Sequence, residues 1–313
     1  MRYSEDADLD TSAVEDMRGG GGGGFGGFGG RGIAVGGGGL GLVGLVIVVL
    51  IQVLGGGGSG TGTSAGTGVG GFSAIGQGQS ADNSQLAAEC RTGSDANAHV
   101  ECAVVADINS IEDFWRQELG SRYTETHTVF FSGSAQTGCG NADSGTGPFY
   151  CPADKLVYID LSFFDTLQQQ FGAEGGLFVD AYVLAHEYGH HVQDILGTES
   201  KVKSGVTGPT SGSVRLELQA DCYAGVWAQH AETVPTATGK PLITEITPDD
   251  ISRALDTAGR IGDDYIQTHL GSGQVDQNSF THGSSAQRKK WFTTGHDSGD
   301  PKSCDTFSTN DLG

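Results

Sequence analysis

Residues 181–193 read AYVLAHEYGHHVQ, and this stretch decides how the rest of the chain is interpreted. Its apolar residues and alanines predict a helix from Ala181 to Leu196 that ends at Gly197. Residues four apart lie on one face of a helix, with their β-carbons roughly 5–6 Å apart. His186 and His190 are therefore expected to point to one place.

Residues 186–190, HEYGH, form an HExxH motif. Two imidazoles so placed can converge on one zinc ion at about 2.0–2.1 Å each. Glu187 is offset by one residue, so its carboxylate can act as a general base on water instead of binding the metal. The alternative is that both histidines are ordinary residues of a helix surface. His191 is turned by about 100° from His190 and is expected to point elsewhere.

A second helix is expected to bring the third ligand. The stretch LELQAD, residues 216–221, lies on a helix predicted over 213–230. A catalytic zinc ion has three protein ligands and one open position, and Glu217 can be the third. Asp221 lies one turn later and can accept the second ring N–H of a ligand histidine, in the first instance His186. The opposite assignment, with Asp221 as the ligand and Glu217 as a solvated acid, stays open.

This set of residues predicts hydrolysis of a peptide bond, with Glu187 passing its proton to the leaving amine. The donor that stabilises the oxyanion does not follow from spacing. His282 is the candidate, just before a predicted helix cap, and Tyr265 and Tyr223 are weaker candidates. An extended substrate is expected to pair with an edge strand, for which Leu156 to Asp160 is the candidate.

Composition excludes one class of function. The chain of 313 residues carries 38 Asp and Glu against 17 Lys and Arg, a net charge of −21. A nucleic-acid partner is therefore not expected, because such binding needs a basic face. Most of the excess among the 54 glycines lies before residue 80, so the foldable part is expected at residues 82–308.

The run from Ile33 to Leu54 has 22 uncharged residues and predicts a transmembrane helix. Over thirty residues precede it, which favours an uncleaved anchor over the alternative, a cleaved signal peptide. Arg18 and Arg31 precede the run, which predicts a cytoplasmic N-terminus and a catalytic domain outside the cell membrane. Residues 1–32 are then a cytoplasmic acidic and glycine-rich tail, and residues 55–81 a Gly/Ser/Thr linker.

Six cysteines without a CxxC pair argue against a zinc ribbon and fit three disulfides in an oxidising compartment. The pairing favoured is Cys90–Cys102 and Cys139–Cys151, each closing a short loop, with Cys222–Cys304 as the remainder. The alternative is six reduced thiols in a cytosolic protein.

The remaining patterns predict an α+β domain, mainly helical with a small β-sheet. Helices are expected over residues 107–119, 162–171, 247–270 and 284–292, and strands over residues 127–131 and 156–160.

Several longer stretches carry a family resemblance. They are SAVEDMR (12–18), TGCGNADSGTGPFYCP (137–152), VYIDLSFF (157–164), AYVLAHEYGHHVQ (181–193), SVRLELQADCYAG (213–225) and FTHGSSAQRKKWF (280–292). The chain resembles the bacterial "putative neutral zinc metallopeptidase" family, membrane-anchored and thermolysin-like. The resemblance implies a zincin-like fold, zinc at His186 and His190, and catalysis by Glu187.

The leading hypothesis is thus a neutral zinc endopeptidase of the cell envelope that acts on peptides or proteins. A second hypothesis is a non-catalytic, zinc-stabilised binding or scaffold domain outside the cytoplasm. A third is a non-haem iron enzyme, because two histidines and one carboxylate also form a facial triad.

Overall fold

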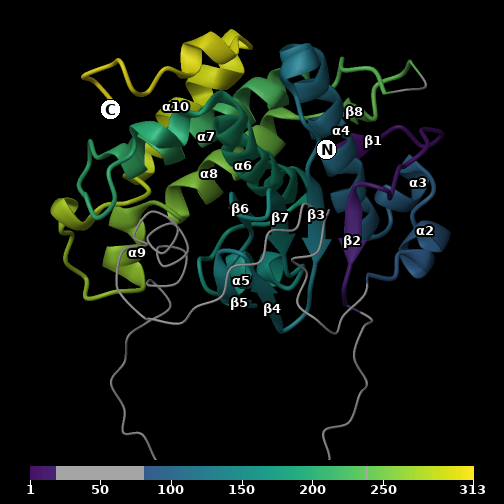
Figure 1. Cartoon of the computed structure of the whole chain (residues 1–313), viewed down its shortest axis with the longest axis horizontal. Helices are drawn as coiled ribbons and strands as arrows, with labels where there is room; N and C mark the ends of the chain where they lie inside the picture. Colours follow the sequence, from purple (N-terminus) through teal and green to yellow (C-terminus); the bar gives the residue numbers. More distant parts are fainter. Residues whose placement is uncertain (19–80, 237–238) are drawn as a thin grey trace, which may run out of the picture.

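The computed structural model describes residues 1–18, 81–236 and 239–313, and its chain forms helices around small sheets (Figure 1). The described helices are α2 (Ser84–Glu89), α3 (Gly93–Ala96), α4 (Val100–Leu119), α5 (Phe163–Gln169), α6 (Leu177–Leu196), α7 (Gly212–His230), α8 (Pro248–Arg260), α9 (Asp263–His269) and α10 (Ser285–Ser298). The described strands are β1 (Arg2–Tyr3), β2 (Val14–Asp16), β3 (His127–Phe130), β4 (Ser134–Thr137), β5 (Gly140–Asp143), β6 (Phe149–Cys151), β7 (Leu156–Ile159) and β8 (Ile243–Glu245). The α+β class is as expected, but the described strands form three small sheets and not one.

The largest sheet has the order β2-β3-β7-β6, with β2, β3 and β7 parallel and β6 antiparallel to β7. The expected edge strand, residues 156–160, is therefore wrong: β7 is paired on both sides. The edge strand beside helix α6 is β6, a three-residue strand whose sequence, FYC, is too short for a periodicity signal.

Helix boundaries follow local capping chemistry. Ser284 and Gln287 form the expected capping box of α10, and Thr247 with Asp250 forms that of α8. Helix α6 ends at Gly197 in the left-handed conformation, with φ 69°. The helix expected over 247–270 is interrupted between α8 and α9, and helix α7 is capped by Ser211 instead of Ser213.

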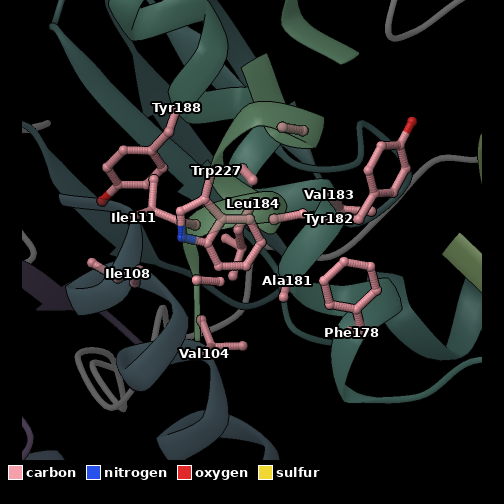
Figure 2. Close-up of a cluster of buried hydrophobic side chains, with 14 of the residues drawn as sticks. Val104, Ile108, Ile111, Phe178, Ala181, Tyr182, Val183, Leu184, Tyr188 and Trp227 are labelled. Carbon is pink, nitrogen blue, oxygen red and sulfur yellow. The ribbon is translucent and has the colours of Figure 1, made fainter. Parts of the chain in front are cut away.

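The core is built where α4, α6 and α7 meet (Figure 2). The indole of Trp227 is fully buried in the same cluster as Ile111 and Leu184, and its N–H donates to Ser110 Oγ at 3.2 Å. Each fully buried side chain of this size contributes about 1.5–3 kcal/mol. Helix α6 is thus held rigidly by its apolar face, which orients the residues on its other faces.

The first 18 residues belong to the folded domain. Strand β1 pairs with β8, β2 pairs with β3, and the amino group of Met1 forms an ion pair of 2.6 Å with Asp250. The N–H of Asp82 donates to the carbonyl of Asp16 at 3.0 Å. The chain therefore returns at residue 82 to the place that it left at residue 18, and a separate N-terminal tail is ruled out for residues 1–18.

This arrangement corrects the expected membrane topology. A single span between residues 18 and 82 would put β2 and β3 on opposite sides of a bilayer, whereas the two strands are hydrogen-bonded neighbours. The span expected at 33–54 lies outside the described residues, and no helix within residues 1–18, 81–236 or 239–313 has the length and apolar character to cross a membrane. The expectations of a transmembrane helix preceding the domain and of a single-pass protein with a cytoplasmic N-terminus are therefore wrong.

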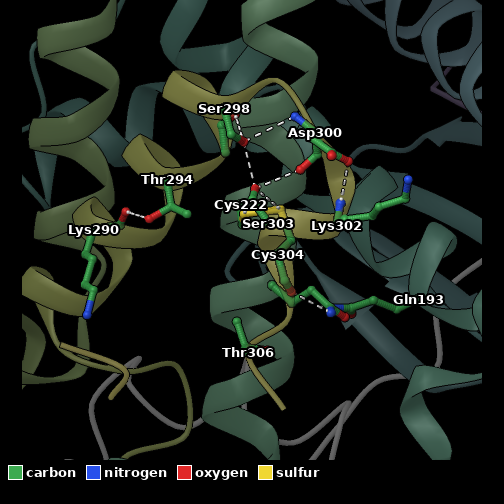
Figure 3. The surroundings of a disulfide bond; sticks show 12 residues. Gln193, Cys222, Lys290, Thr294, Ser298, Asp300, Lys302, Ser303, Cys304 and Thr306 are labelled. Atoms are coloured by element: carbon green, nitrogen blue, oxygen red, sulfur yellow. Dashed lines mark hydrogen bonds between the residues drawn. A yellow bond between two sulfur atoms is a disulfide. The ribbon is translucent and has the colours of Figure 1, made fainter. Parts of the chain in front are cut away.

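All three expected disulfides are present. They are Cys90–Cys102, Cys139–Cys151 and Cys222–Cys304. The third joins α7 to the segment after α10, as Figure 3 shows. The second ties the edge strand β6 to the turn between β4 and β5.

Candidate metal centre

Two helices bring the expected ligands together. Helix α6 carries His186 and His190, and helix α7 carries Glu217; one ligand atom of each lies within 4.8 Å of the others. The Nε2 atoms of His186 and His190 lie 3.2 and 3.6 Å from the two carboxylate oxygens of Glu217. Donors at about 2.0–2.1 Å from one tetrahedral ion lie about 3.3 Å apart, so these separations fit a zinc ion.

The site is buried, with His186, His190 and Glu217 each less than a tenth exposed. Among the described residues no other group of three His, Cys, Asp or Glu side chains converges in this way. Glu187 lies outside the cluster, on the same helix, as its offset predicted.

Asp221 orients the first imidazole. Its Oδ1 lies 2.9 Å from Nδ1 of His186, which leaves Nε2 of that ring facing Glu217. Asp221 also accepts from the hydroxyl of Tyr182 at 2.7 Å and from two nitrogens of Arg288, each at 2.9 Å. These four hydrogen bonds engage both carboxylate oxygens of Asp221, so the rival assignment of Asp221 as the ligand does not fit the geometry.

Arg288 was not identified from the sequence. It is buried, and the charge of Asp221 raises its pKa despite the opposing effect of burial. Helix α10 can reach Asp221 because Gly295 and Gly225 let it approach α7 closely. A β-carbon at Gly295 would lie only 1.9 Å from the carbonyl oxygen of Cys222. The pair of glycines is the only sequence signal for this contact.

A chain of amides orients the second imidazole. The carbonyl of Leu216 can only accept, and it takes a hydrogen bond from Gln193 Nε2 at 2.8 Å. The amide oxygen of Gln193 therefore faces Nδ1 of His190 at 2.8 Å, which leaves Nε2 for a metal. Gln193 donates also to Gln219, and Gln219 donates to the carbonyl of Cys304. Gln193 lies one turn after His190 and could have been sought by that spacing.

Glu187 is placed against the sheet. Its Oε2 accepts from the backbone N–H of Tyr150, in edge strand β6, at 2.9 Å. Burial raises the pKa of Glu187 to about 7, partly offset by the charge of His186. A carboxylate with a pKa near neutrality is suited to taking and returning a proton.

His282 is buried in the turn before α10. Its Nδ1 is 3.2 Å from Asp263 Oδ1, while Asp263 Oδ2 accepts from the backbone N–H groups of residues 281, 282 and 283. The buried Nε2 of His282 has no hydrogen-bond partner among the described residues. Burial lowers the pKa of His282, but Asp263 and the charge of Glu217 outweigh burial and raise it.

The other candidates lie elsewhere. Tyr265 donates to the carbonyl of Phe171, and Tyr223 packs edge-on against Trp115. His191 turns away from the cluster, and its Nε2 donates to the carbonyl of Thr124 at 2.7 Å. Asp263 was not predicted as a partner of His282. Its orientation depends on the interruption between α8 and α9, which was not predicted either.

The donor set of two imidazoles and one carboxylate is one that binds a single zinc ion in proteins. The comparisons agree. The model of the family described as "Putative neutral zinc metallopeptidase" matches residues 1–307, and the chain belongs to this family. Zinc is the cofactor that the family implies, and the cluster could hold it.

Relatives cover most of the chain. The uncharacterized protein Rv2575 of Mycobacterium tuberculosis (strain H37Rv) is 51% identical over 226 residues, which cover 72% of this chain and 76% of the relative. The uncharacterized protein YpfJ of Escherichia coli K12 is 41% identical over 238 residues, which cover 74% of this chain and 78% of the relative. No solved structure matches the chain.

Proposed function

We propose that this chain hydrolyses peptide bonds in peptides or proteins, with zinc held by His186, His190 and Glu217. The observation that carries the proposal is the buried cluster of these three side chains, whose ligand atoms lie within 4.8 Å of one another. Each histidine also has its Nδ1 engaged, by Asp221 and by Gln193, so the nitrogens left for the metal face Glu217.

A zinc ion supplies Lewis-acid activation of water and of the substrate carbonyl. Glu187 takes the proton of the attacking water on its carboxylate and then delivers it to the leaving amine. Its burial and its pKa of about 7 support this role. The hydrogen bond from the N–H of Tyr150 keeps one carboxylate oxygen in place, and the other is left for the proton.

His282 is the proposed donor to the developing oxyanion, through its Nε2–H. Two observations support it: the imidazole is oriented by Asp263, and its buried Nε2 has no hydrogen-bond partner in the part of the chain that the structure describes. A donor held in place before the reaction loses no free energy in reorganising.

Strand β6 is the proposed place of an extended substrate. It is an edge of its sheet and contacts α6, and its Tyr150 touches Glu187. A sheet edge can bind a peptide backbone by strand addition with little dependence on side chains.

The test is cleavage of casein by the full chain, with and without a chelator, and by the variant Glu187→Gln. Loss of cleavage in the chelated protein and in Glu187→Gln, with zinc still bound to the variant, is the expected result. Glu112→Gln is the matched control, because Glu112 is also buried but lies on α4, outside the cluster.

Two outcomes would overturn the proposal. Bound zinc without any cleavage that depends on Glu187 would favour a zinc-stabilised scaffold. Stoichiometric iron in the purified protein would favour a facial-triad iron enzyme.

A further inference from the structure

Strand β6 is short and needs more than its sheet to hold it. It has three residues, and it pairs with β7 along one side only. Nothing in such pairing sets the distance between the strand and helix α6, which carries Glu187. That distance decides where a substrate bound along β6 lies relative to the base, so the contacts between the strand and the helix matter for the reaction.

One residue makes three polar contacts with the helix. The backbone N–H of Tyr150 donates to Glu187 Oε2 at 2.9 Å, and its hydroxyl donates to Asp194 Oδ2 at 2.9 Å. The same hydroxyl lies 3.1 Å from Nδ1 of His191. Residues 187, 191 and 194 share one helix face, and 187 and 194 are about 10 Å apart along the axis. Tyr150 therefore fixes the position of β6 along the axis of α6 and the orientation of the strand relative to that axis.

The partners of the hydroxyl are themselves held. His191 is buried, and its Nε2 donates to the carbonyl of Thr124 at 2.7 Å. The ring of Tyr123 lies edge-on to the imidazole, with centroids 5.7 Å apart. The residue after Tyr150 is Cys151, which is tied to Cys139. The hydroxyl of Tyr150 thus connects helix α6 to strand β6, which the disulfide Cys139–Cys151 also holds.

We propose that Tyr150 is a positioning residue that fixes the register of the substrate-binding strand against the general base, through the hydrogen bond that its hydroxyl donates to Asp194. The inference rests on the proposed peptidase function. Misplacement of reacting groups by about 1 Å can cost a hundredfold in rate, so loosening this contact lowers kcat more than it raises KM.

If the hydroxyl of Tyr150 served stability alone, removing any comparable buried hydroxyl of the sheet would change kcat equally. Tyr158 supplies this control. Tyr158, in the adjacent strand β7, is as buried as Tyr150 and donates its hydroxyl to Asp154 at 2.8 Å. Tyr158→Phe therefore removes the same kind of hydrogen bond from the same sheet without touching α6.

The experiment measures kcat and KM of the full chain on a quenched fluorescent peptide. Tyr150→Phe is expected to lower kcat about tenfold with KM within twofold and bound zinc unchanged, while Tyr158→Phe keeps kcat within twofold. Asp194→Ala is expected to lower kcat similarly, and to add little in the Tyr150→Phe background, because both remove one contact.

A second measurement is independent of activity. Amide hydrogen exchange over residues 148–152 is expected to speed up about tenfold in Tyr150→Phe and to stay unchanged in Tyr158→Phe. Wild-type kcat or wild-type exchange in Tyr150→Phe would overturn the inference, as would an equal loss in Tyr158→Phe. If Glu187→Gln cleaves at the wild-type rate, the proposed function itself fails, and the exchange data alone then decide whether Tyr150 holds the strand.

Discussion

Each imidazole of the candidate zinc site has its second nitrogen engaged by a different side chain. Asp221 faces Nδ1 of His186 and Gln193 faces Nδ1 of His190, at 2.9 and 2.8 Å. The two rings are therefore oriented with Nε2 towards Glu217, which raises metal affinity. Arg288 compensates the charge of Asp221 in a buried place, where an unpaired carboxylate would cost several kcal/mol.

His282→Ala tests the proposed oxyanion donor. Removing one such donor typically costs about a hundredfold in kcat, and zinc content is expected to stay the same because His282 is outside the ligand cluster. His269→Ala, at an exposed histidine of α9, is the control and is expected to retain full turnover. Unchanged kcat in His282→Ala would remove this residue from the mechanism.

Glu112 gives stability a pH dependence. Burial raises its pKa from 4.5 to about 7. The folded state therefore binds more protons than the unfolded state between these pH values. The stability that the neutral carboxyl contributes is present below pH 4.5 and is lost as pH rises through 7, by up to about 3 kcal/mol.

Glu112→Gln, which is neutral at every pH, is accordingly expected to melt several degrees above the wild type at pH 8 and at the same temperature at pH 4.5. Thermal unfolding followed by circular dichroism checks this. Glu118→Gln changes an exposed glutamate of the same helix and should show no such difference. Equal melting temperatures of Glu112→Gln and the wild type at pH 8 would contradict the expectation.

At the scale of elements, the site depends on the close packing of α7 against α10 and on the break between α8 and α9. Helices α7 and α10 pack backbone to backbone at Gly225 and Gly295, which brings Arg288 to Asp221. The interruption between α8 and α9 turns Asp263 towards His282. Edge strand β6 is held by a disulfide and by Tyr150.

Two disulfides of equal loop length separate stability from activity. Cys139–Cys151 and Cys90–Cys102 each span 12 residues, so their removal is expected to cost similar stability, roughly 3 kcal/mol. Only Cys139–Cys151 includes a residue of strand β6. The double variant Cys139→Ser/Cys151→Ser is expected to lose about fivefold in kcat, and Cys90→Ser/Cys102→Ser less than twofold. The check is steady-state kinetics below both melting temperatures, and equal kcat values would count against a role of the first disulfide in holding β6.

At the scale of the whole molecule, the fold is discontinuous in sequence. Residues 1–18 supply β1 and β2 and bury Tyr3 and Val14 in the core, and the chain rejoins the domain at residue 82. Each of these buried side chains contributes about 1.5–3 kcal/mol. The N-terminal residues are therefore part of what stabilises the domain.

A truncation measures this contribution. A chain of residues 82–313 is expected to melt well below the full chain, whereas residues 1–18 joined by a short Gly/Ser linker to residues 81–313 are expected to melt within a few degrees of it and to bind zinc. Thermal unfolding by circular dichroism distinguishes them. Equal stability of the two shortened chains would contradict the integration of the N-terminus.

Sequence reasoning reached the features that local chemistry encodes. The HExxH spacing and the later Glu217 and Asp221 lie on single helices, where residue spacing translates directly into a shared face. The capping box at Ser284 and the disulfide pairing of short loops are equally local.

Features that depend on packing between distant segments stayed out of reach. Arg288 lies 67 residues from Asp221, and no periodicity connects them. The membrane topology went wrong because an apolar run and two arginines carry no information on the pairing of residues 14–16 with residues 128–130. Strand β6 was not predicted because three residues are too few for a periodicity signal. The longer apolar run in β7 was therefore predicted as the edge strand of the sheet.

X-ray absorption at the zinc edge of the purified full chain tests the central claim most directly, because it reports the atoms around the metal. We expect about one zinc per chain, with two imidazole nitrogens and carboxylate oxygen at about 2.0–2.2 Å. All six cysteines are in disulfides, so no sulfur is expected. Sulfur at about 2.3 Å, or a protein without zinc, would contradict this claim.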